Sequence, residues 1–342
     1  MKSITLNEPG QFVRSTCEDP GRPGPGMARI QIDKVGICGT DLHAFRGRQP
    51  FFMYPRILGH ELGVVVTEVG DGVDSVQPGD RCAVEPYLNC GTCVACRAGK
   101  TNCCTQLEVL GVHVDGGMRD TILFPAHKLH TSKQLETQQL ALVETLGIGA
   151  HAVDRAQPES GEKVLVIGAG PIGLSVIQFA AVRGPDITLL ELNPSRGDFA
   201  REQFGIKRVL NDLDTVQDEL VAWTDGDLPT AVFDATGNGD SMMSAFQYVA
   251  NGGRLTLVGL IQGDITFNDP EFHRREMTIL ASRNARSEDF KRIIELIESG
   301  KVDTSPWITH RAGYDDFVES FPSWLEPESK VVKAMLSLGD SG

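Results

Sequence analysis

The sequence has no apolar run long enough to cross a lipid bilayer, although 41% of its 342 residues are hydrophobic, because a spanning helix needs about 20 consecutive apolar residues. Its first residues, MKSITLNEPG, lack the apolar core of a secretion signal. Positive charge is also scarce, and the formal net charge of −14 argues against a nucleic-acid or anionic-membrane surface. We therefore expect a cytoplasmic protein with no nucleic-acid or membrane partner, and the length favours two domains.

Cysteines are unevenly placed, since five of the eight lie in the stretch Cys90–Cys104, CGTCVACRAGKTNCC. Thiolates gathered on one short loop suit a tetrahedral Zn²⁺ ion. The alternatives are a disulfide cluster or reactive thiols. However, a disulfide requires a particular separation and direction of the two Cβ atoms, and spaced cysteines in a cytosolic enzyme more often bind metal. The loop therefore predicts a closed, structural zinc site that performs no chemistry.

The segment 1–150 is rich in short β-like runs and turns, such as ARIQIDKVGICG, and predicts a twisted, barrel-like β domain. It also holds three candidate metal ligands: Cys38, His60 and Glu144. Taken singly, these could be a small core residue, a satisfied interior histidine and a solvated helix residue. Together, beside a cysteine loop, they predict a catalytic zinc site with three protein ligands and one open position.

From about Gly161 the pattern changes to that of a dinucleotide-binding domain. The apolar strand KVLVI precedes Gly168-Ala169-Gly170-Pro171-Ile172-Gly173, and a helical run follows. Glycines in this context allow a tight turn and bring a pyrophosphate close to the helix N-terminus. Glu191 ends the next strand, where a carboxylate binds ribose hydroxyls and repels a 2′-phosphate. The sequence therefore predicts NAD, while the nearby Arg196 favours NADP.

Further strands, AVFDAT and RLTLVGL, extend the same doubly wound parallel sheet. Their ends supply four more candidate cofactor contacts, for which a plain strand-to-helix connection is the alternative: Thr236, Val258, Gly259 and Leu260. An amphipathic helix, DFKRIIELIESG, and a strand within SKVVKAMLSL then return to the first domain. The fold class predicted is α/β, with a discontinuous β-rich domain (1–150 and 286–342) and a nucleotide-binding domain (151–285).

The motifs CGTDLH, GHE and the cysteine loop, in this order, resemble the zinc-dependent medium-chain alcohol and polyol dehydrogenase family over essentially the full length. The resemblance implies a GroES-like zinc-binding catalytic domain, a Rossmann domain, NAD, and two zinc ions per chain. It implies that Cys38 and His60 bind the catalytic zinc, that Glu61 can approach it, and that Asp41 accepts a hydrogen bond that orients His60. The structural ligands implied are Cys90, Cys93, Cys96 and Cys104, which leaves Cys103 as a spare thiol.

The resemblance also assigns a proton relay and an assembly. Thr40 and His43 match the family's relay positions, so that a proton passes from the substrate through Thr40, a cofactor ribose hydroxyl and His43. Glu144 stands where the simple alcohol dehydrogenases have a cysteine, and in this respect resembles the sorbitol- and threonine-type branch. In that branch the glutamate binds zinc directly or through water. The family further implies a homodimer or homotetramer.

Four stretches are similar to the bacterial L-galactonate and L-gulonate 5-dehydrogenase branch: Gly47–Phe52, GVHVDGG, NDPEFHRRE and ASRNA. This resemblance implies oxidation of a hexonate at C5. A carboxylate substrate needs a cation, and arginine offers a two-pronged donor. Arg283 is the candidate, with Arg46, Arg48 and His113 as alternatives, and an inter-domain or subunit salt bridge is the other explanation for Arg283.

Several rival functions remain at this stage. Within the family, sorbitol, threonine or simple alcohols are alternative substrates. A zinc-independent reductase of the same superfamily would lack the set of Cys38, His60 and Glu144, so the sequence disfavours it. A non-enzymatic binding protein that keeps the fold is disfavoured by the intact candidate ligands, relay residues and glycine loop.

Overall fold

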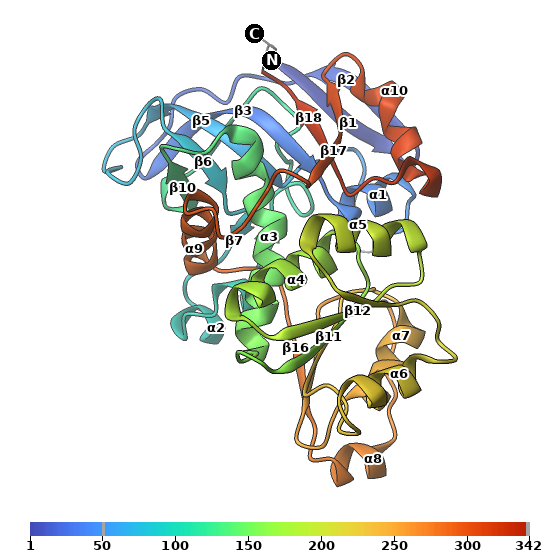
Figure 1. Cartoon of the computed structure of the whole chain (residues 1–342). Coiled ribbons are helices and arrows are strands. Elements are labelled where there is room, and N and C mark those ends of the chain that lie inside the picture. The colour runs from blue at the N-terminus through green and yellow to red at the C-terminus, as the bar shows by residue number, and fades with distance from the viewer. Residues whose placement is uncertain (50–51, 340–342) are drawn as a thin grey trace. The chain divides into compact units, whose positions relative to one another are not determined.

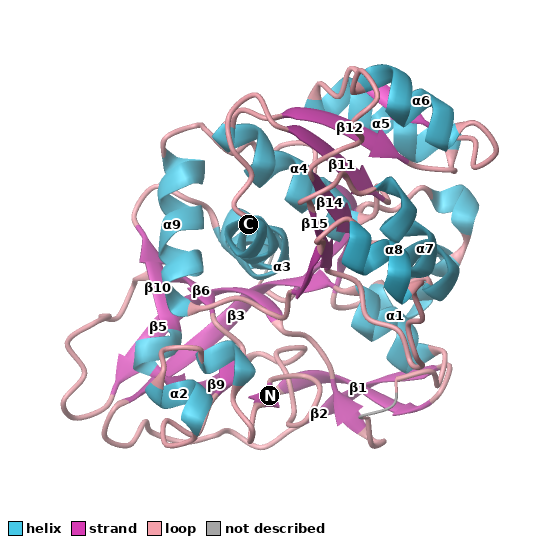
Figure 2. Ribbon diagram, turned by 90° about the horizontal axis from the view of Figure 1, so that it is seen from below, coloured by secondary structure: helices cyan, strands magenta, loops and turns pink. Residues whose placement is uncertain are grey.

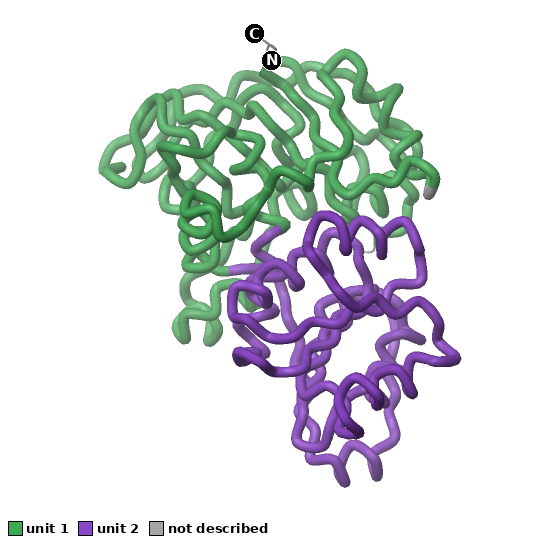
Figure 3. Tube along the Cα trace, in the orientation of Figure 1, with its two compact units in different colours: residues 1–145, 286–342 green, residues 146–285 purple. Residues whose placement is uncertain are grey.

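The computed structural model describes residues 1–49 and 52–339, so Pro50 and Phe51 of the stretch compared above lie outside the described residues. The chain divides into two compact units, which Figure 3 colours separately. The first unit is Met1–Thr145 with Arg286–Gly342, and the second is Leu146–Ala285. The division falls within helix α3 (Thr137–Ala156), as does the domain boundary expected from the sequence.

The first unit is built mainly from antiparallel strands. One sheet has the order β2-β1-β4, a larger one has the order β10-β6-β5-β3-β18-β17 with β9 also paired to β3, and β7 pairs with β8. The strands are β1 (Lys2–Glu8), β2 (Gln11–Thr16), β3 (Met27–Ile37), β4 (Arg56–Ile57), β5 (Glu61–Val69), β6 (Arg81–Val84), β7 (Tyr87–Leu88), β8 (Glu108–Val109), β9 (Thr121–Pro125), β10 (Leu129–Ser132), β17 (Ile308–Gly313) and β18 (Lys333–Ser337). The helices are α1 (Gly39–Phe45), α2 (Val94–Arg97), the N-terminal part of α3, α9 (Ser287–Glu298) and α10 (Phe317–Ser320), with short 3-10 turns η1 (Thr101–Cys103), η2 (Ala126–Lys128), η4 (Phe321–Leu325) and η5 (Pro327–Ser329).

The C-terminal strand returns to the first unit, as the sequence predicts. β18 pairs antiparallel with β3, which places Ala334 opposite Ile37, and Figure 1 shows the red β18 beside the blue β3. The amphipathic pattern of DFKRIIELIESG forms α9, whose buried face includes Phe290, Ile293 and Ile297. The first unit is therefore discontinuous in sequence.

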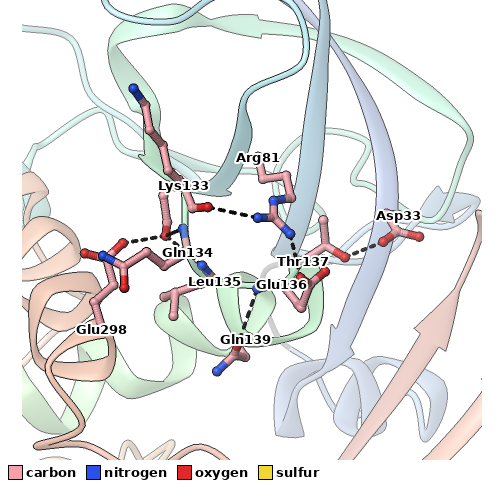
Figure 4. A network of polar contacts seen from close by, with 10 residues as sticks. Asp33, Arg81, Lys133, Gln134, Leu135, Glu136, Thr137, Gln139 and Glu298 are labelled. Carbon is pink, nitrogen blue, oxygen red and sulfur yellow. Dashed lines mark hydrogen bonds and ion pairs between the residues drawn. The ribbon is translucent and has the colours of Figure 1, made fainter.

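Polar contacts fasten the start of α3 to β3 and β6, and a neighbouring contact joins β10 to α9 (Figure 4). The hydroxyl of Thr137 donates to Asp33 of β3, and Arg81 of β6 donates to Glu136. Ser132 of β10 donates to Glu298 of α9. Side chains therefore fix the entry of the helix that carries Glu144.

A second, buried network joins Glu85, directly after β6, to Lys128 of η2 and His130 of β10. Glu85 accepts hydrogen bonds from Lys128 and from Ser287, and His130 Nε2 lies 3.2 Å from Glu85 Oε2. Burial alone would raise the pKa of Glu85, but hydrogen bonds from His130, Lys128 and Ser287 outweigh burial and lower it. Because Ser287 begins α9, this network ties the returning chain to the β-rich core.

The second unit is a six-stranded sheet of order β13-β12-β11-β14-β15-β16, with every pair parallel. Figure 2 shows β12, β11, β14 and β15 side by side with helices flanking them. The strands are β11 (Lys163–Ile167), β12 (Asp186–Leu190), β13 (Arg208–Leu210), β14 (Ala231–Asp234), β15 (Arg254–Leu257) and β16 (Thr278–Ala281); the helices are α4 (Pro171–Arg183), α5 (Pro194–Phe204), α6 (Val216–Trp223), α7 (Gly239–Ser244) and α8 (Asp269–Arg274), with the 3-10 turn η3 (Ala245–Tyr248). Parallel strands buried by helices give the doubly wound class predicted from the sequence.

Among the described residues, no helix combines the length and the apolar character needed to cross a membrane.

We expect Glu85→Gln to lower the free energy of unfolding at neutral pH by about 3 kcal/mol, because Lys128 would remain buried without an anionic partner. A carboxylate with a depressed pKa stabilises the fold above its ordinary pKa, and that stability is lost as the pH falls through its folded-state pKa. The difference in free energy of unfolding between the wild type and the variant should therefore decrease at acidic pH. Urea denaturation at neutral and acidic pH measures both effects.

Glu136→Gln is the matched control, since it removes an exposed partner of Arg81 and should cost less than about 1 kcal/mol. Equal effects of the two substitutions would show that the Glu85 network carries no special stability.

Candidate functional site

Cys38, His60 and Glu61 form a compact group of metal-ligand atoms in the first unit. One ligand atom from each residue lies within 4.8 Å of those of the other two, and His60 and Glu61 are buried. The strand register explains the grouping, because Gly36 of β3 pairs with Glu61 of β5. A Cβ atom at Gly36 would overlap Glu61 Oε2, so this position has no room for a side chain.

Lys333 forms a buried ion pair with Glu61 that the sequence analysis missed. Lys333 Nζ lies 2.6 Å from Glu61 Oε1, and it also donates to the carbonyl of Ile37 at 3.2 Å. Burial would lower the pKa of Lys333, but the carboxylate of Glu61 outweighs it, so that the pKa is raised. A lysine within the otherwise apolar strand KAMLS was the one available signal.

Two buried side-chain atoms of the group, His60 Nδ1 and Glu61 Oε2, have no hydrogen-bond partner within the described part of the chain. The same holds for Oδ1 of Asp41, three residues after Cys38. Asp41 therefore does not accept the expected hydrogen bond from His60. Its Oδ2 atom instead accepts from the backbone N–H of Cys38 at 2.8 Å and caps the first turn of α1. An unpartnered carboxylate oxygen beside a thiol and an imidazole fits a Zn²⁺ ion, which binds this donor set.

The pKa values of His60 and Asp41 reflect burial and neighbouring charge. Burial would lower the pKa of His60, but Cys38, Asp41 and Glu144 together raise it well above its ordinary value. Burial raises the pKa of Asp41, and His60 partly opposes this.

Glu144 lies on α3 and is buried, but it is outside the compact group of Cys38, His60 and Glu61. Its Oε1 atom accepts a hydrogen bond from the hydroxyl of Tyr87, a residue that the sequence analysis did not name. Burial raises the pKa of Glu144, against the effect of the nearby His60.

The two relay candidates lie on α1, directly after Cys38. Thr40 is partly buried, whereas His43 is exposed. Residues three apart on a helix lie on the same face, so both side chains lie along one side of α1.

The four cysteines Cys90, Cys93, Cys96 and Cys104 form a second compact group of ligand atoms. Backbone N–H groups point at their sulfur atoms; for example, the N–H of Cys93 donates to Cys90 Sγ at 3.4 Å. Backbone N–H donors lower the pKa of Cys93 to about 5. The hydroxyl of Thr92, together with backbone donors, lowers the pKa of Cys90 to about 7, whereas burial raises the pKa of Cys96 to about 11. Cys103 is exposed and outside the group, and all eight cysteines are unbridged, which argues against a disulfide cluster.

In the second unit, the glycine loop joins β11 to α4 as predicted. Gly168 has a φ of +93°, and a Cβ atom at Gly173 would overlap the Gly168 carbonyl oxygen. Gly170 is the N-cap of α4, and Pro171 and Ile172 form its first turn. The turn and the close helix packing are those of a phosphate-binding loop.

Glu191 follows β12 and lies against this loop. Its Oε2 atom accepts from the N–H of Ala169 and its Oε1 atom from the N–H of Asn193, each at 2.7 Å. Arg196 is exposed in the first turn of α5. The carboxylate is therefore held in a fixed orientation at the carboxyl edge of the sheet.

The other cofactor candidates end β14 and β15, neighbours in the same parallel sheet. Thr236 donates to Asp234 Oδ1 at 2.6 Å, and a Cβ atom at Gly259 would overlap the backbone of Gly237. Val258 is buried, whereas Leu260 is 81% exposed. Close approach of the two turns explains the glycine at position 259, and a φ of +62° favours the glycine at position 237.

The substrate candidates lie in different units. Arg283 is exposed and follows β16 in the second unit. His113 is exposed in the first unit, where its Nδ1 atom accepts from the N–H of Val109 at 3.0 Å. Arg46, the alternative after α1, donates to the carbonyl of Leu325.

A β-rich unit with two groups of metal ligands, in one chain with a doubly wound nucleotide-binding sheet, defines a metal-dependent dehydrogenase. A family model described as the alcohol dehydrogenase GroES-like domain matches residues 24–134, and one described as zinc-binding dehydrogenase matches residues 171–299. The chain belongs to the zinc-dependent alcohol dehydrogenase family. The family and fold class predicted from the sequence are therefore confirmed.

The chain is similar to L-galactonate-5-dehydrogenase of Escherichia coli K12, with 36% identity over 98% of this chain and 99% of that protein. It is 32% identical to 2-dehydro-3-deoxy-L-galactonate 5-dehydrogenase of Pseudoalteromonas atlantica, over 92% of each chain. An alcohol dehydrogenase from Escherichia coli CFT073, solved with NADH, has a TM-score of 0.92 and 30% identity over 99% of each chain.

We expect Cys104→Ser to release one zinc ion per chain and to destabilise the fold, because binding of a structural zinc is coupled to folding. Cys103→Ser is the matched control, since its exposed thiol lies outside the group, and it should keep the full zinc content. Metal analysis and thermal unfolding of both variants measure this, and the reverse pair of results would mean that Cys103 is the ligand.

Proposed function

We propose that this protein is an NAD-dependent, zinc-containing dehydrogenase that oxidises a secondary alcohol of a hexonate, such as L-galactonate or L-gulonate at C5. The observation that carries the proposal is the buried group of Cys38, His60 and Glu61, with its unpartnered carboxylate oxygen, in a chain 36% identical to an L-galactonate-5-dehydrogenase. In the proposed reaction, alcohol and NAD⁺ become ketone, NADH and a proton.

Cys38, His60 and Glu61 would hold the catalytic zinc, and Glu144, whose pKa is affected by the charge of His60, would join them through one oxygen or through water. When bound, Zn²⁺ supplies a Lewis acid that lowers the pKa of a substrate hydroxyl. Lys333 neutralises Glu61 and occupies its Oε1 atom, which leaves Oε2 for the metal. Cys90, Cys93, Cys96 and Cys104 would bind the second, structural zinc ion.

Thr40 and His43 would move the proton released by the alcohol. The hydroxyl of Thr40 can accept and donate, and the exposed imidazole of His43 can pass the proton to solvent. Glu191 would accept hydrogen bonds from the adenosine ribose, and the N-terminus of α4 would receive the pyrophosphate of NAD.

We expect Glu191→Ala to lower the ratio of kcat/KM for NAD⁺ to kcat/KM for NADP⁺ by roughly tenfold or more, because hydrogen bonds to a charged group contribute about 1.5–3 kcal/mol. The variant loses the ribose acceptor and also the repulsion of a 2′-phosphate. Steady-state kinetics with both cofactors measure the ratio.

Glu202→Ala is the matched control, since it removes an exposed carboxylate from α5 in the same unit. A wild type that prefers NADP⁺ would contradict the proposal and assign the 2′-phosphate to Arg196.

The substrate is tested by NAD⁺ reduction with an aldonate and its matching alditol, together with simple alcohols and threonine. We expect the aldonate to give the highest kcat/KM. Arg283→Ala should lower that value by roughly 10- to 100-fold and change the alditol value far less, because only the acid has a carboxylate for the guanidinium.

Arg274→Ala serves as the control, because this arginine is exposed on α8 and pairs with Glu271. A wild type that oxidises the neutral polyol or threonine better than the acid would replace the hexonate proposal by sorbitol- or threonine-type chemistry.

A further inference from the structure

Tyr87 is a buried tyrosine whose hydroxyl points at the proposed metal site. Its side chain is only 2% exposed, and its hydroxyl donates to Glu144 Oε1, 57 residues further along the chain. A buried phenol normally needs a hydrogen-bond partner, and Glu144 is the partner here. A phenylalanine would fill the same space, so packing alone does not explain a tyrosine.

The position of this phenol is fixed from several sides. Tyr87 pairs with Val109 in the two-stranded sheet of β7 and β8. Its ring packs edge-on against Phe290, with ring centroids 6.3 Å apart, and Phe290 stacks on His130. Two residues earlier, Glu85 is anchored by Lys128 and His130. The hydroxyl therefore has little freedom to follow a moving carboxylate.

The carboxylate of Glu144 is restrained in turn. It is buried and lies close enough to His60 and Lys333 for their charges to affect its pKa, yet it is outside the group of Cys38, His60 and Glu61. A fixed donor on Oε1 restrains rotation of the carboxylate and leaves Oε2 as the oxygen available to a cation. Partners that hold metal ligands in this way tune both orientation and affinity.

We propose that Tyr87 is a positioning residue that fixes Glu144, so that this carboxylate meets the catalytic metal through one oxygen only. The inference rests on the catalytic-metal assignment made under the proposed function. It adds a tyrosine from β7 and a defined orientation of Glu144 to that site.

The experiment follows release of zinc to a chromogenic chelator from zinc-loaded wild type, Tyr87→Phe, Glu144→Gln and the double variant. We expect Tyr87→Phe to weaken binding of one of the two zinc ions by about 10- to 100-fold and to leave the other unchanged. Because Tyr87 acts through Glu144, the double variant should bind this zinc no more weakly than Glu144→Gln alone.

Tyr314→Phe is the matched control, because its hydroxyl lies in the same unit and donates to the backbone carbonyls of Ser3 and Ser15. It should leave release of both zinc ions unchanged. The visible absorption spectrum of the enzyme with Co²⁺ in the catalytic site gives a second measurement, which should change in Tyr87→Phe and not in Tyr314→Phe.

Unchanged zinc release together with an unchanged cobalt spectrum in Tyr87→Phe would overturn the inference, as would strictly additive effects in the double variant. A wild type that binds only one zinc ion would instead overturn the proposed function. If Tyr87→Phe does not fold, a crystal structure of the zinc-loaded wild type decides the question. The contact between Tyr87 and Glu144 Oε1 must then persist with only Oε2 directed at the metal, and its absence refutes the inference.

Discussion

The ion pair between Lys333 and Glu61 is the interaction on which the proposed catalytic metal site of the first unit depends. Both side chains are almost completely buried, and a buried charge is tolerated only when a partner and further hydrogen bonds compensate for lost solvation. The pair has a geometric consequence, because it occupies Oε1 and leaves Oε2 unpartnered. It also makes β18 indispensable, since the lysine comes from a strand that joins the sheet only after the chain has completed the second unit.

The backbone register beneath this pair is equally restrictive. Gly36 lies opposite Glu61, and no side chain at this position would leave room for the carboxylate. Cys38 follows two residues later, at the point where β3 ends and α1 begins, and Asp41 holds its backbone N–H. A glycine, a strand end and a helix cap therefore combine to place a thiol beside a histidine and a carboxylate.

The success of sequence-based prediction here depended on how far apart the interacting residues are. The cysteine loop and the glycine loop carry their information within a few residues, and the strand KVLVI coincides with β11. Lys333 and Tyr87 could not be found in this way, because their partners lie 272 and 57 residues away. Asp41 shows the opposite case, a local contact that was not foreseen: an acidic residue three positions after an N-cap accepts from the N-cap backbone through Oδ2, while Oδ1 and His60 Nδ1 have no partner among the described residues.

The network around Glu85 and the contact between Tyr87 and Glu144 are joined through three consecutive residues, Glu85, Pro86 and Tyr87. Glu85 is held by Lys128, His130 and Ser287, and Tyr87 holds Glu144 from the other side of Pro86. The network around Glu85 lies at the residue where the chain re-enters the unit, whereas Tyr87 contacts a residue of the proposed metal site. A rigid, charge-compensated network limits the motion of the residues attached to it. The stability of the segment around Ser287 and the orientation of Glu144 are therefore coupled. If Glu144 binds the proposed metal, the network around Glu85 would therefore affect metal binding through Tyr87.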